Sequence, residues 1–495
     1  MRSPAHDLDE GLKASGDPVA DLRRWIEDAV EYQPADNPAD LEAHLKDCTD
    51  TGNAELLAAL HGDKLRYDHS RKRWLVWAGH WWQEDPDDER VRLAIDAARW
   101  RLQHAWELPK EEAERVAKFA LKCRNHYHLS KSLEIAKALH PIADRGEGWD
   151  ANPMVLGVAN GVVDLRTGQL RDGTPDERIT KHSPIAFDPD ADCPRWKRFL
   201  EEVFQGDEEL IEFVRLAIGY SLTGKMTEQC FLVCWGKGAN GKGVLLETLR
   251  HIIGDYAFDA GFETFTNDKQ HSESVANLAG KRFVTGAEVR EHTHLNEQRL
   301  KALSHGDTLS ARHLYGHRFE FRPECKIWLA LNHKPVVADD SAGFWRSVRL
   351  IPFRRQFLGV DADTELDKHF RKEAAGILTW AVRAAVDWTV HGLTLPEDVV
   401  EVTTAWAAET DPLAEFLADW TTEASSIFTP SAILWRAYCA WADEEGVPRR
   451  ERLTHNKFAR KLGEDYKADR KVVAGKLVRG YWGIGLCAEE AIYEV

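Results

Sequence analysis

Residues 236–243 are Gly-Lys-Gly-Ala-Asn-Gly-Lys-Gly, and they decide how this sequence folds. Their spacing is that of the phosphate-binding loop G-x-x-x-x-G-K-[ST], except that Gly243 stands where a hydroxyl would bind Mg²⁺. Glycines let such a backbone pass close to phosphates, and its N–H groups form a concave anion site. The motif predicts a nucleoside triphosphate, and the glycine at its end predicts that the metal is held in another way.

The flanking residues provide the required strand and helix. Residues 231–235 form a short apolar run typical of a buried parallel strand. Residues 244–253 place apolar side chains on one helical face, and Gly254 ends the helix. The helix N-terminus adds partial positive charge, and Lys242 is expected to reach the β- and γ-phosphates. The predicted ligands are ATP and Mg²⁺, and the predicted nucleotide contacts are Gly236, Gly238, Asn240, Gly241, Lys242, Gly243 and Val244.

Composition limits the class of protein. The chain has 495 residues, enough for about two to four domains. Its net charge of −17 requires any nucleic-acid contact to come from local basic patches. Eight cysteines without a repeated pair spacing, no signal peptide and no apolar run near 18 residues predict a cytoplasmic protein with no membrane partner, in the host bacterial cytoplasm if phage-encoded. Cys123, His126 and His128 lie close together, but no second ligand pair matches them, so we interpret them as ordinary helix or loop residues.

The pattern along the chain predicts a multidomain α/β protein. Residues 1–50 form an acidic, partly mobile segment with one helix near residues 22–32. Strands are predicted at 65–82 and 155–170, and helices at 88–142 and 195–225. Residues 231–355 alternate between strand and helix patterns, and 365–420 are helical with a break at 393–396. The predicted divisions are 1–50, 51–194, 195–360, 361–424 and 425–495.

Polar residues follow two further strands of the predicted core. A strand over 282–288 ends in Glu288, with Glu291 three positions later, and carboxylates there suit Mg²⁺ binding and water orientation. A strand over 326–332 ends in Asn332, whose amide suits a γ-phosphate. Arg346 and Arg349 come next, and one arginine is a candidate arginine finger that acts across a subunit boundary.

Two segments, a predicted hairpin and the last unit of the chain, are candidates for DNA contact. Gly316 suits a hairpin tip that presents Tyr315, His317 and Arg318, which combine stacking and charge. A Ser/Thr-rich link over residues 422–430 precedes a last unit.

In that unit we expect Thr429 and Pro430 to open a helix over 431–445, followed by a helix over 454–463 and a ribbon over 471–484 that turns at Gly480. This order is typical of a winged helix. Residues 449–479 carry eleven basic against four acidic residues, so Lys457, Arg460 and Lys461 are predicted phosphate contacts.

A family resemblance follows from the order of these motifs. Residues 301–315, Lys-Ala-Leu-Ser-His-Gly-Asp-Thr-Leu-Ser-Ala-Arg-His-Leu-Tyr, resemble the B′ motif of superfamily 3 helicases, which are AAA+-like ring ATPases of viruses, phages and plasmids. Residues 67–85, 160–168 and 194–196 resemble the domain upstream of the helicase in phage and plasmid primases of the P4 / poxvirus D5 type. The resemblance covers about residues 50–420.

The resemblance implies an AAA+-like ATPase core at 195–360 and a mostly helical D5-type domain at 51–194. It makes Glu288 the Walker B carboxylate and metal ligand, Glu291 its companion, Asn332 the sensor, Arg346 the preferred finger and Arg349 the second choice. It also implies a ring, expected to be a hexamer, that translocates on single-stranded DNA in phage or plasmid replication.

Three alternatives remain. An initiator that binds an origin would show DNA-stimulated ATPase without strand displacement. A primase–helicase would need a separate primase or polymerase chain, because no polymerase-type carboxylate cluster precedes residue 50. A metabolic P-loop kinase would leave the basic C-terminal unit unexplained.

Overall fold

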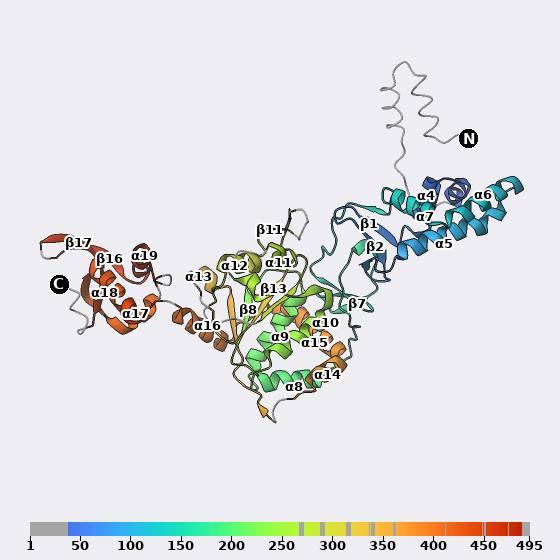
Figure 1. Ribbon diagram of the computed structural model, residues 1–495. Helices are drawn as coiled ribbons and strands as arrows, with labels where there is room; N and C mark the ends of the chain where they lie inside the picture. Colours follow the sequence, from blue (N-terminus) through green and yellow to red (C-terminus); the bar gives the residue numbers. More distant parts are fainter. Residues whose placement is uncertain are drawn as a thin grey trace, which may run out of the picture. The chain divides into compact units, whose positions relative to one another are not determined.

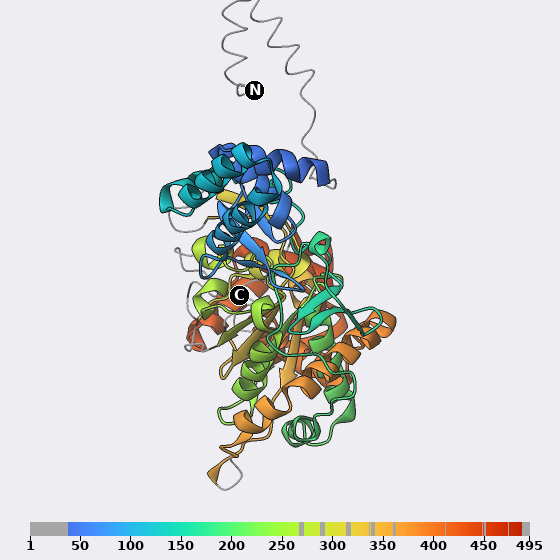
Figure 2. The ribbon, with the colours of Figure 1, turned by 90° about the vertical axis from the view of Figure 1, so that its right-hand side faces the viewer.

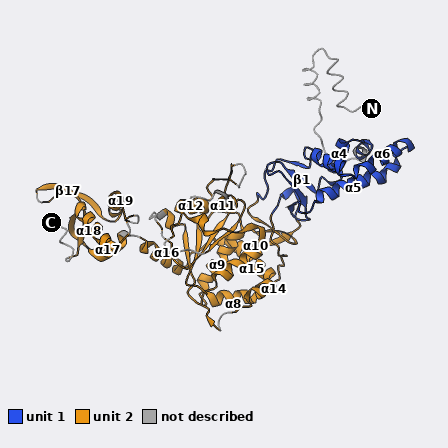
Figure 3. Ribbon diagram, in the orientation of Figure 1, with its two compact units in different colours: residues 1–151, 173–180 blue, residues 152–172, 181–495 orange. Residues whose placement is uncertain are grey.

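The computed structural model describes residues 38–266, 272–287, 293–312, 318–335, 337, 342–359, 363–410, 412–447, 449, 452–473 and 475–487. The chain forms two compact units, residues 1–151 with 173–180 and residues 152–172 with 181–495 (Figures 1 and 3). This confirms a multidomain α/β protein, and the five-part division stays a prediction. No helix in the described ranges has the length and apolar character needed to span a membrane.

The first unit packs helices around a four-stranded sheet of order β3-β2-β1-β4. Its core gathers leucines and alanines of α4, α5 and α7 against Leu65 and Val76 of the sheet. The predicted strands near 65–82 and helices over 88–142 are confirmed. The elements are α3 (Pro38–Lys46), α4 (Asp50–His61), β1 (Leu65–Asp68), β2 (Arg73–Trp77), β3 (Trp82–Glu84), α5 (Glu89–His104), η1 (Ala105–Glu107), α6 (Lys110–Cys123), α7 (His126–Ala136), β4 (Ala143–Asp144) and η2 (Pro175–Glu177).

The second unit is built on a parallel sheet of order β14-β8-β13-β10-β9. Figure 2 shows this sheet turned by 90°, with helices on both of its faces. Its strands are β8 (Phe231–Trp235), β9 (Ala257–Asp259), β10 (Phe283–Ala287), β13 (Lys326–Leu331) and β14 (Val348–Pro352). The chain leaves β8 toward β9 on one side, whereas β14 pairs with β8 on the other. The carboxyl end of β8 is therefore a topological switch point.

Alternation along β8 explains its unbroken apolar sequence. Leu232 and Cys234 pack into one core, with α8, α9, α10, α14 and α15, while Phe231 and Val233 pack into the other, with α12 and α16. A strand covered on both faces needs apolar residues at every position. These helices are α8 (Pro194–Val203), α9 (Glu208–Leu222), α10 (Lys242–Ile253), α12 (Glu297–His305), α14 (Leu366–Lys372), α15 (Ala374–His391) and α16 (Glu397–Glu409).

Shorter elements surround the sheet. The predicted turns at Gly161 and Gly168 join three antiparallel strands, and the predicted helix break at 393–396 separates α15 from α16. The remaining elements before residue 410 are β5 (Val155–Val158), β6 (Gly161–Asp164), β7 (Gln169–Arg171), η3 (Gly254–Tyr256), η4 (Phe262–Phe265), α11 (Ser272–Ala276), β11 (Leu309–Arg312), β12 (Arg318–Phe321) and α13 (Ala342–Trp345).

The C-terminal elements correct three predictions, which concern the link over 422–430, the helix cap at Thr429 and the turn at Gly480. They are α17 (Pro412–Trp420), β15 (Thr421–Pro430), α18 (Ser431–Glu444), α19 (His455–Asp465), β16 (Lys467–Val473) and β17 (Lys476–Leu486), with sheet order β15-β17-β16. The predicted link over 422–430 is strand β15. Thr429 is not a helix cap, because its Oγ1 donates to the carbonyl of Ile484 at 2.6 Å.

Gly480 lies inside β17 and not at a turn. A Cβ there would meet the Thr429 carbonyl oxygen at 2.4 Å and the Phe428 ring at 2.6 Å, so close approach of β15 explains the glycine. Gly475, with φ 77°, lies where β16 and β17 are joined.

A close helix contact supports the first prediction, on Gly219→Ala. A Cβ on Gly219 of α9 would lie 2.3 Å from backbone atoms of Ala384 and Ala385 in α15. We expect the substitution to cost about 1–3 kcal/mol and to lower the melting temperature by several degrees in a thermal scan. The matched control is Gly463→Ala in α19, where the nearest atom lies at 4.0 Å, and it should be neutral or slightly stabilising. Equal melting temperatures for the two variants would contradict this packing.

Candidate functional site

The glycine-rich loop lies between two neighbouring strand ends. Residues 236–241 connect the end of β8 to the start of α10. Gly236 N donates to the carbonyl of Leu331 in β13 at 3.2 Å, and Phe353 N, just after β14, donates to the carbonyl of Trp235 at 2.7 Å. The loop therefore occupies the switch point, where open parallel sheets bind ligands.

Two of the loop glycines are required by their surroundings. Gly241 has φ 86° and caps α10, and a Cβ on Gly236 would lie 2.2 Å from the Phe353 carbonyl oxygen. Gly238 and Gly243 differ, because a Cβ at either position meets no atom within 4 Å. Packing within this chain thus does not explain the glycine at 243, and space for a hydroxyl exists there.

Lys242 is the centre of the site. It is 5% exposed, and its Nζ donates to the Gly236 carbonyl at 2.5 Å, to Asn240 Oδ1 at 3.0 Å and to Asn332 Oδ1 at 3.2 Å. All three acceptors are neutral, and burial lowers the pKa of Lys242 to about 8. An anion that enters the loop would supply the missing countercharge and favour the protonated lysine.

The other predicted contacts divide into side-chain and backbone roles. Asn332 follows β13 and meets Lys242 as the strand order requires. Asn240 also donates from Nδ2 to the Phe353 carbonyl at 3.2 Å, which fixes the amide. Val244 is partly buried against the core, so its backbone N–H is the group left for a ligand.

The segment after β14 supports the loop and was not predicted from the sequence. Gln356 Nε2 donates to the Gly238 carbonyl at 2.9 Å, and Phe357 N donates to the Ala239 carbonyl at 2.7 Å. The signal that could have found this segment is that it directly follows β14, which pairs with β8 on the side away from β13. Lys334, just beyond Asn332, lies 4.7 Å from the Trp235 ring centroid and pairs with Glu409.

Arg346 and Arg349 lie at the opposite end of the sheet from Lys242. Val348 pairs with Phe231 and Pro352 with Trp235, so four strand steps, about 13 Å, separate the arginine end of β14 from the loop end. Arg349 Nη1 donates to the carbonyls of Arg346 and Val348 at 2.6 and 2.9 Å, and Arg346 is exposed. Both line a groove between β14 and α16 and are not brought together with Lys242.

Four predicted residues, Glu288, Glu291, Tyr315 and His317, lie outside the described residues. Ala287, the last residue of β10, pairs with Ala330 of β13, two residues before Asn332. Arg318 begins β12, is exposed, and lies opposite Arg312 of β11. The two strands flanking the predicted hairpin tip are thus confirmed.

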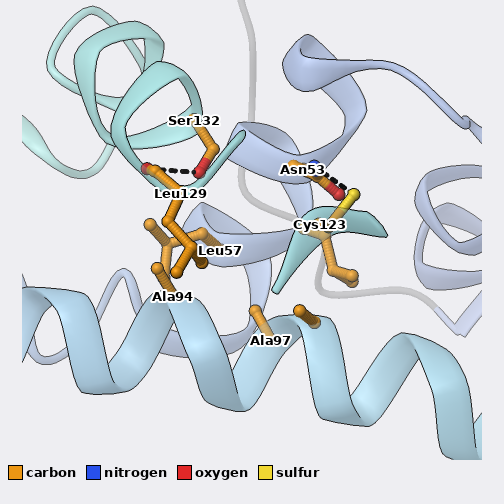
Figure 4. A pocket seen from close by; sticks show the side chains of 9 residues that line it. Asn53, Leu57, Ala94, Ala97, Cys123, Leu129 and Ser132 are labelled. Carbon is orange, nitrogen blue, oxygen red and sulfur yellow. Dashed lines mark hydrogen bonds between the residues drawn. The ribbon is translucent and has the colours of Figure 1, made fainter. Parts of the chain in front are cut away.

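The Cys123 region does not form a metal cluster. Cys123 faces a cavity of about 10 Å³ and accepts a hydrogen bond from Asn53 Nδ2 at 3.0 Å (Figure 4). His128 Nδ1 lies 2.6 Å from Asp50 Oδ1, and His126 contacts Ser130. Across the residues that the structure describes, no group of three His, Cys, Asp or Glu side chains has metal-binding geometry.

The C-terminal basic residues divide by exposure. Lys457 and Arg460 are exposed on α19, whereas Lys461 is 9% exposed. Lys461 is therefore poorly placed for the predicted phosphate contact. All seven residues of β16 are exposed, and Arg470 lies directly opposite Arg479 of β17. Like charges opposite each other are unfavourable unless an anion joins them.

Three family models match separate parts of the chain. The model described as D5 N terminal like matches residues 54–205, a family of unknown function (DUF5906) matches 234–349, and the model described as poxvirus D5 protein-like matches 408–475.

Named proteins that are similar to this chain come from large DNA viruses. A provisionally named helicase of Acanthamoeba polyphaga mimivirus is 29% identical over 55% of this chain and 31% of its own length. A provisionally named helicase of Frog virus 3 is 22% identical over 70% of this chain and 44% of its own. A provisionally named primase of African swine fever virus is 24% identical over 40% of this chain and 22% of its own. The chain thus spans less than half the length of each of these relatives.

Among solved structures, the apo C-terminal region of NrS-1 covers 86% of this chain and 98% of its own, with 13% identity and a TM-score of 0.47. The two D5-related segments and the viral relatives agree with the motif order and support a D5-type primase-helicase family.

Proposed function

We propose that this chain is an ATP-dependent DNA helicase of the superfamily 3 type that acts in DNA replication. The observation that carries the proposal is Lys242, a buried cation at the switch point of a parallel sheet, in contact with Asn332 and with neutral partners alone among the described residues. The strand order, the loop and the viral relatives named as helicases support an AAA+-like ATPase core in this chain.

The site residues fit a triphosphate. Lys242 would bind the β- and γ-phosphates, the N–H groups of the loop and of Gly243 and Val244 would surround them, and Asn332 would lie beside the γ-phosphate. Mg²⁺ would neutralise phosphate charge when bound, with Glu288 as the expected protein ligand and Glu291 as its companion.

The position of Arg346 supports a ring. An arginine about 13 Å along β14 from the loop end cannot serve the site of its own subunit, yet an exposed arginine at a sheet edge can enter the site of a neighbour. We therefore propose a ring, a hexamer by the family resemblance, in which Arg346 completes the adjacent ATP site and Arg349 is the second choice.

DNA would be bound by two basic regions of the second unit. The β11–β12 hairpin places Arg312 opposite Arg318, and with Tyr315 and His317 it would hold single-stranded DNA. The C-terminal elements resemble a winged helix, and their exposed Lys457 and Arg460 would contact phosphates.

A replication initiator without strand displacement is the second candidate. The exposed basic ribbon of β16 and β17 favours it, because a two-stranded ribbon also fits the major groove of duplex DNA.

The function is tested by unwinding of a forked DNA with ATP. We expect the wild type to displace the strand and Lys242→Ala to lose at least about a hundredfold of the ATPase rate, because the substitution removes the ammonium that would bind the β- and γ-phosphates. DNA-stimulated ATPase without displacement would support the initiator, and ATPase unchanged in Lys242→Ala would overturn both proposals.

Mixed assemblies test the position of the finger. Arg346→Ala subunits keep an intact loop and Lys242→Ala subunits keep an intact arginine, so each variant alone should be inactive and their mixture should recover part of the ATPase rate. Arg371→Ala, an exposed arginine of α14, is the control and should be fully active. No recovery on mixing, or active monomers of Arg346→Ala, would rule out a finger acting between subunits.

Gly243→Ser tests how the metal is held. The serine Cβ has free space, and its hydroxyl adds the ligand that the motif lacks, so the Mg²⁺ concentration for half-maximal ATPase should fall several-fold. Gly243→Ala adds the Cβ alone and should leave the requirement unchanged. An equal Mg²⁺ requirement in wild type and Gly243→Ser would refute the idea.

A further inference from the structure

The corner between α6 and α7 concentrates positive charge in the first unit. Residues 115–131 contain five Lys or Arg and no Asp or Glu, in a chain of net charge −17. All five are exposed, and Arg115 Nη2 donates to the Lys46 carbonyl, which leaves the four cations Lys118, Lys122, Arg124 and Lys131. None of the four forms an ion pair with a carboxylate in the part of the chain that the structure describes. The corner therefore carries exposed positive charges that pair with no carboxylate of the described chain.

Two large apolar side chains lie among these cations. Leu121 is 57% exposed and Tyr127 is 62% exposed, close to the C-terminus of α6 and the N-terminus of α7. Lys131 Nζ lies 5.9 Å from the Tyr127 ring centroid, one helical turn away. Folding gains nothing by exposing a tyrosine ring, whereas an exposed ring beside cations suits a ligand that has both planar faces and negative charge.

Contacts with α4 hold the corner in place. Asn53 Nδ2 donates to Cys123 at the end of α6, and Asp50 contacts His128 in the first turn of α7. Phe119 packs edge-on against His128 with ring centroids 6.2 Å apart. Because both helix ends are anchored to α4, the exposed side chains start from a rigid backbone and lose less freedom on binding.

We propose that the α6–α7 corner, defined by Lys118, Leu121, Lys122, Arg124, Tyr127 and Lys131, is a second binding site for single-stranded nucleic acid. Tyr127 stacks on a base, Leu121 covers its edge, and the cations contact the phosphates on either side. An acidic protein segment would satisfy the cations but leave the tyrosine face unused, so single-stranded nucleic acid fits the surface better. The site is independent of ATP and of the basic regions of the second unit.

The test measures binding of fluorescein-labelled dT20 to the full chain by fluorescence anisotropy, without nucleotide. We expect the double variant Lys122→Glu/Arg124→Glu to lose at least about tenfold in affinity, with a salt-dependence slope reduced by about 1.4, the value for two lost phosphate contacts. Tyr127→Ala should lose at least about fivefold, and Tyr127→Phe should keep wild-type affinity because stacking needs only the ring.

Lys110→Glu is the matched control, since it reverses an exposed charge at the other end of α6, thirteen residues or about 20 Å from the corner. Equal losses for Lys110→Glu and the double variant would mean a general charge effect and would overturn the site. Poly-glutamate is the second probe. If the wild type bound it as tightly as dT20, and the variants lost affinity for it by the same factors, the corner would be assigned to acidic proteins instead.

Two further measurements separate this site from the proposed helicase. Photocrosslinking with 5-iodouracil oligonucleotides should label Tyr127, and labelling confined to the second unit would refute the proposal. The same losses should appear in a Lys242→Ala background, so a failed ATPase assignment would leave this result standing.

Discussion

The candidate site depends on one buried interaction, the ammonium of Lys242 shared between the loop that follows β8 and the residue that follows β13. It requires β13 and β8 to be neighbours with the same direction, so that Asn332 and the loop reach the same edge of the sheet. It also requires the segment after β14 on the other side, where the Phe353 carbonyl accepts from Asn240 and excludes a side chain at 236. The cation thus links the loop after β8 to the residue after β13 directly, and to the segment after β14 through Asn240. Since all the described partners of that cation are neutral, a bound anion would stabilise the arrangement.

A pair of buried cations, Arg282 and Lys326, lies at the opposite end of the sheet. Arg282 precedes β10 and donates to the carbonyls of Val155 and Leu222, and Lys326 begins β13 and contacts the carbonyls of Thr223 and Glu324. Leu222 and Thr223 form the C-terminus of α9, where the helix dipole favours positive charge. Burial lowers the pKa of Lys326 to about 7. The two ends of one sheet therefore use cations differently, since carbonyls of a helix terminus stabilise one pair while Lys242 retains capacity for a ligand.

Local signals predicted the loop because the chemistry of a phosphate loop is local. The strand at 231–235, the helix to Ile253 and the stop at Gly254 match the structure closely. The same kind of signal failed at Thr429, Pro430 and Gly480, because pairing between β15 and β17 determines their conformation and no short window contains both strands. Gln356 and Phe357 were missed for the same reason, since their partners lie over a hundred residues away. Lys461 shows that a count of charges does not reveal which side chains face the core.

The distribution of charge constrains how such a protein can select nucleic acid. Residues 115–131 and 449–479 carry +5 and +7, so the rest of the chain carries −29. A phosphate backbone is repelled by most of this surface and attracted at a few places, each of which also presents exposed apolar side chains, Tyr127 in one and Val472 and Leu477 in the other. Charge alone would attract any polyanion, whereas an aliphatic or aromatic side chain among the cations favours a polyanion that also offers apolar or planar groups, as unpaired bases do. On the proposed function, acidic surroundings would suppress binding elsewhere, and the mixed patches would determine which polyanion is bound.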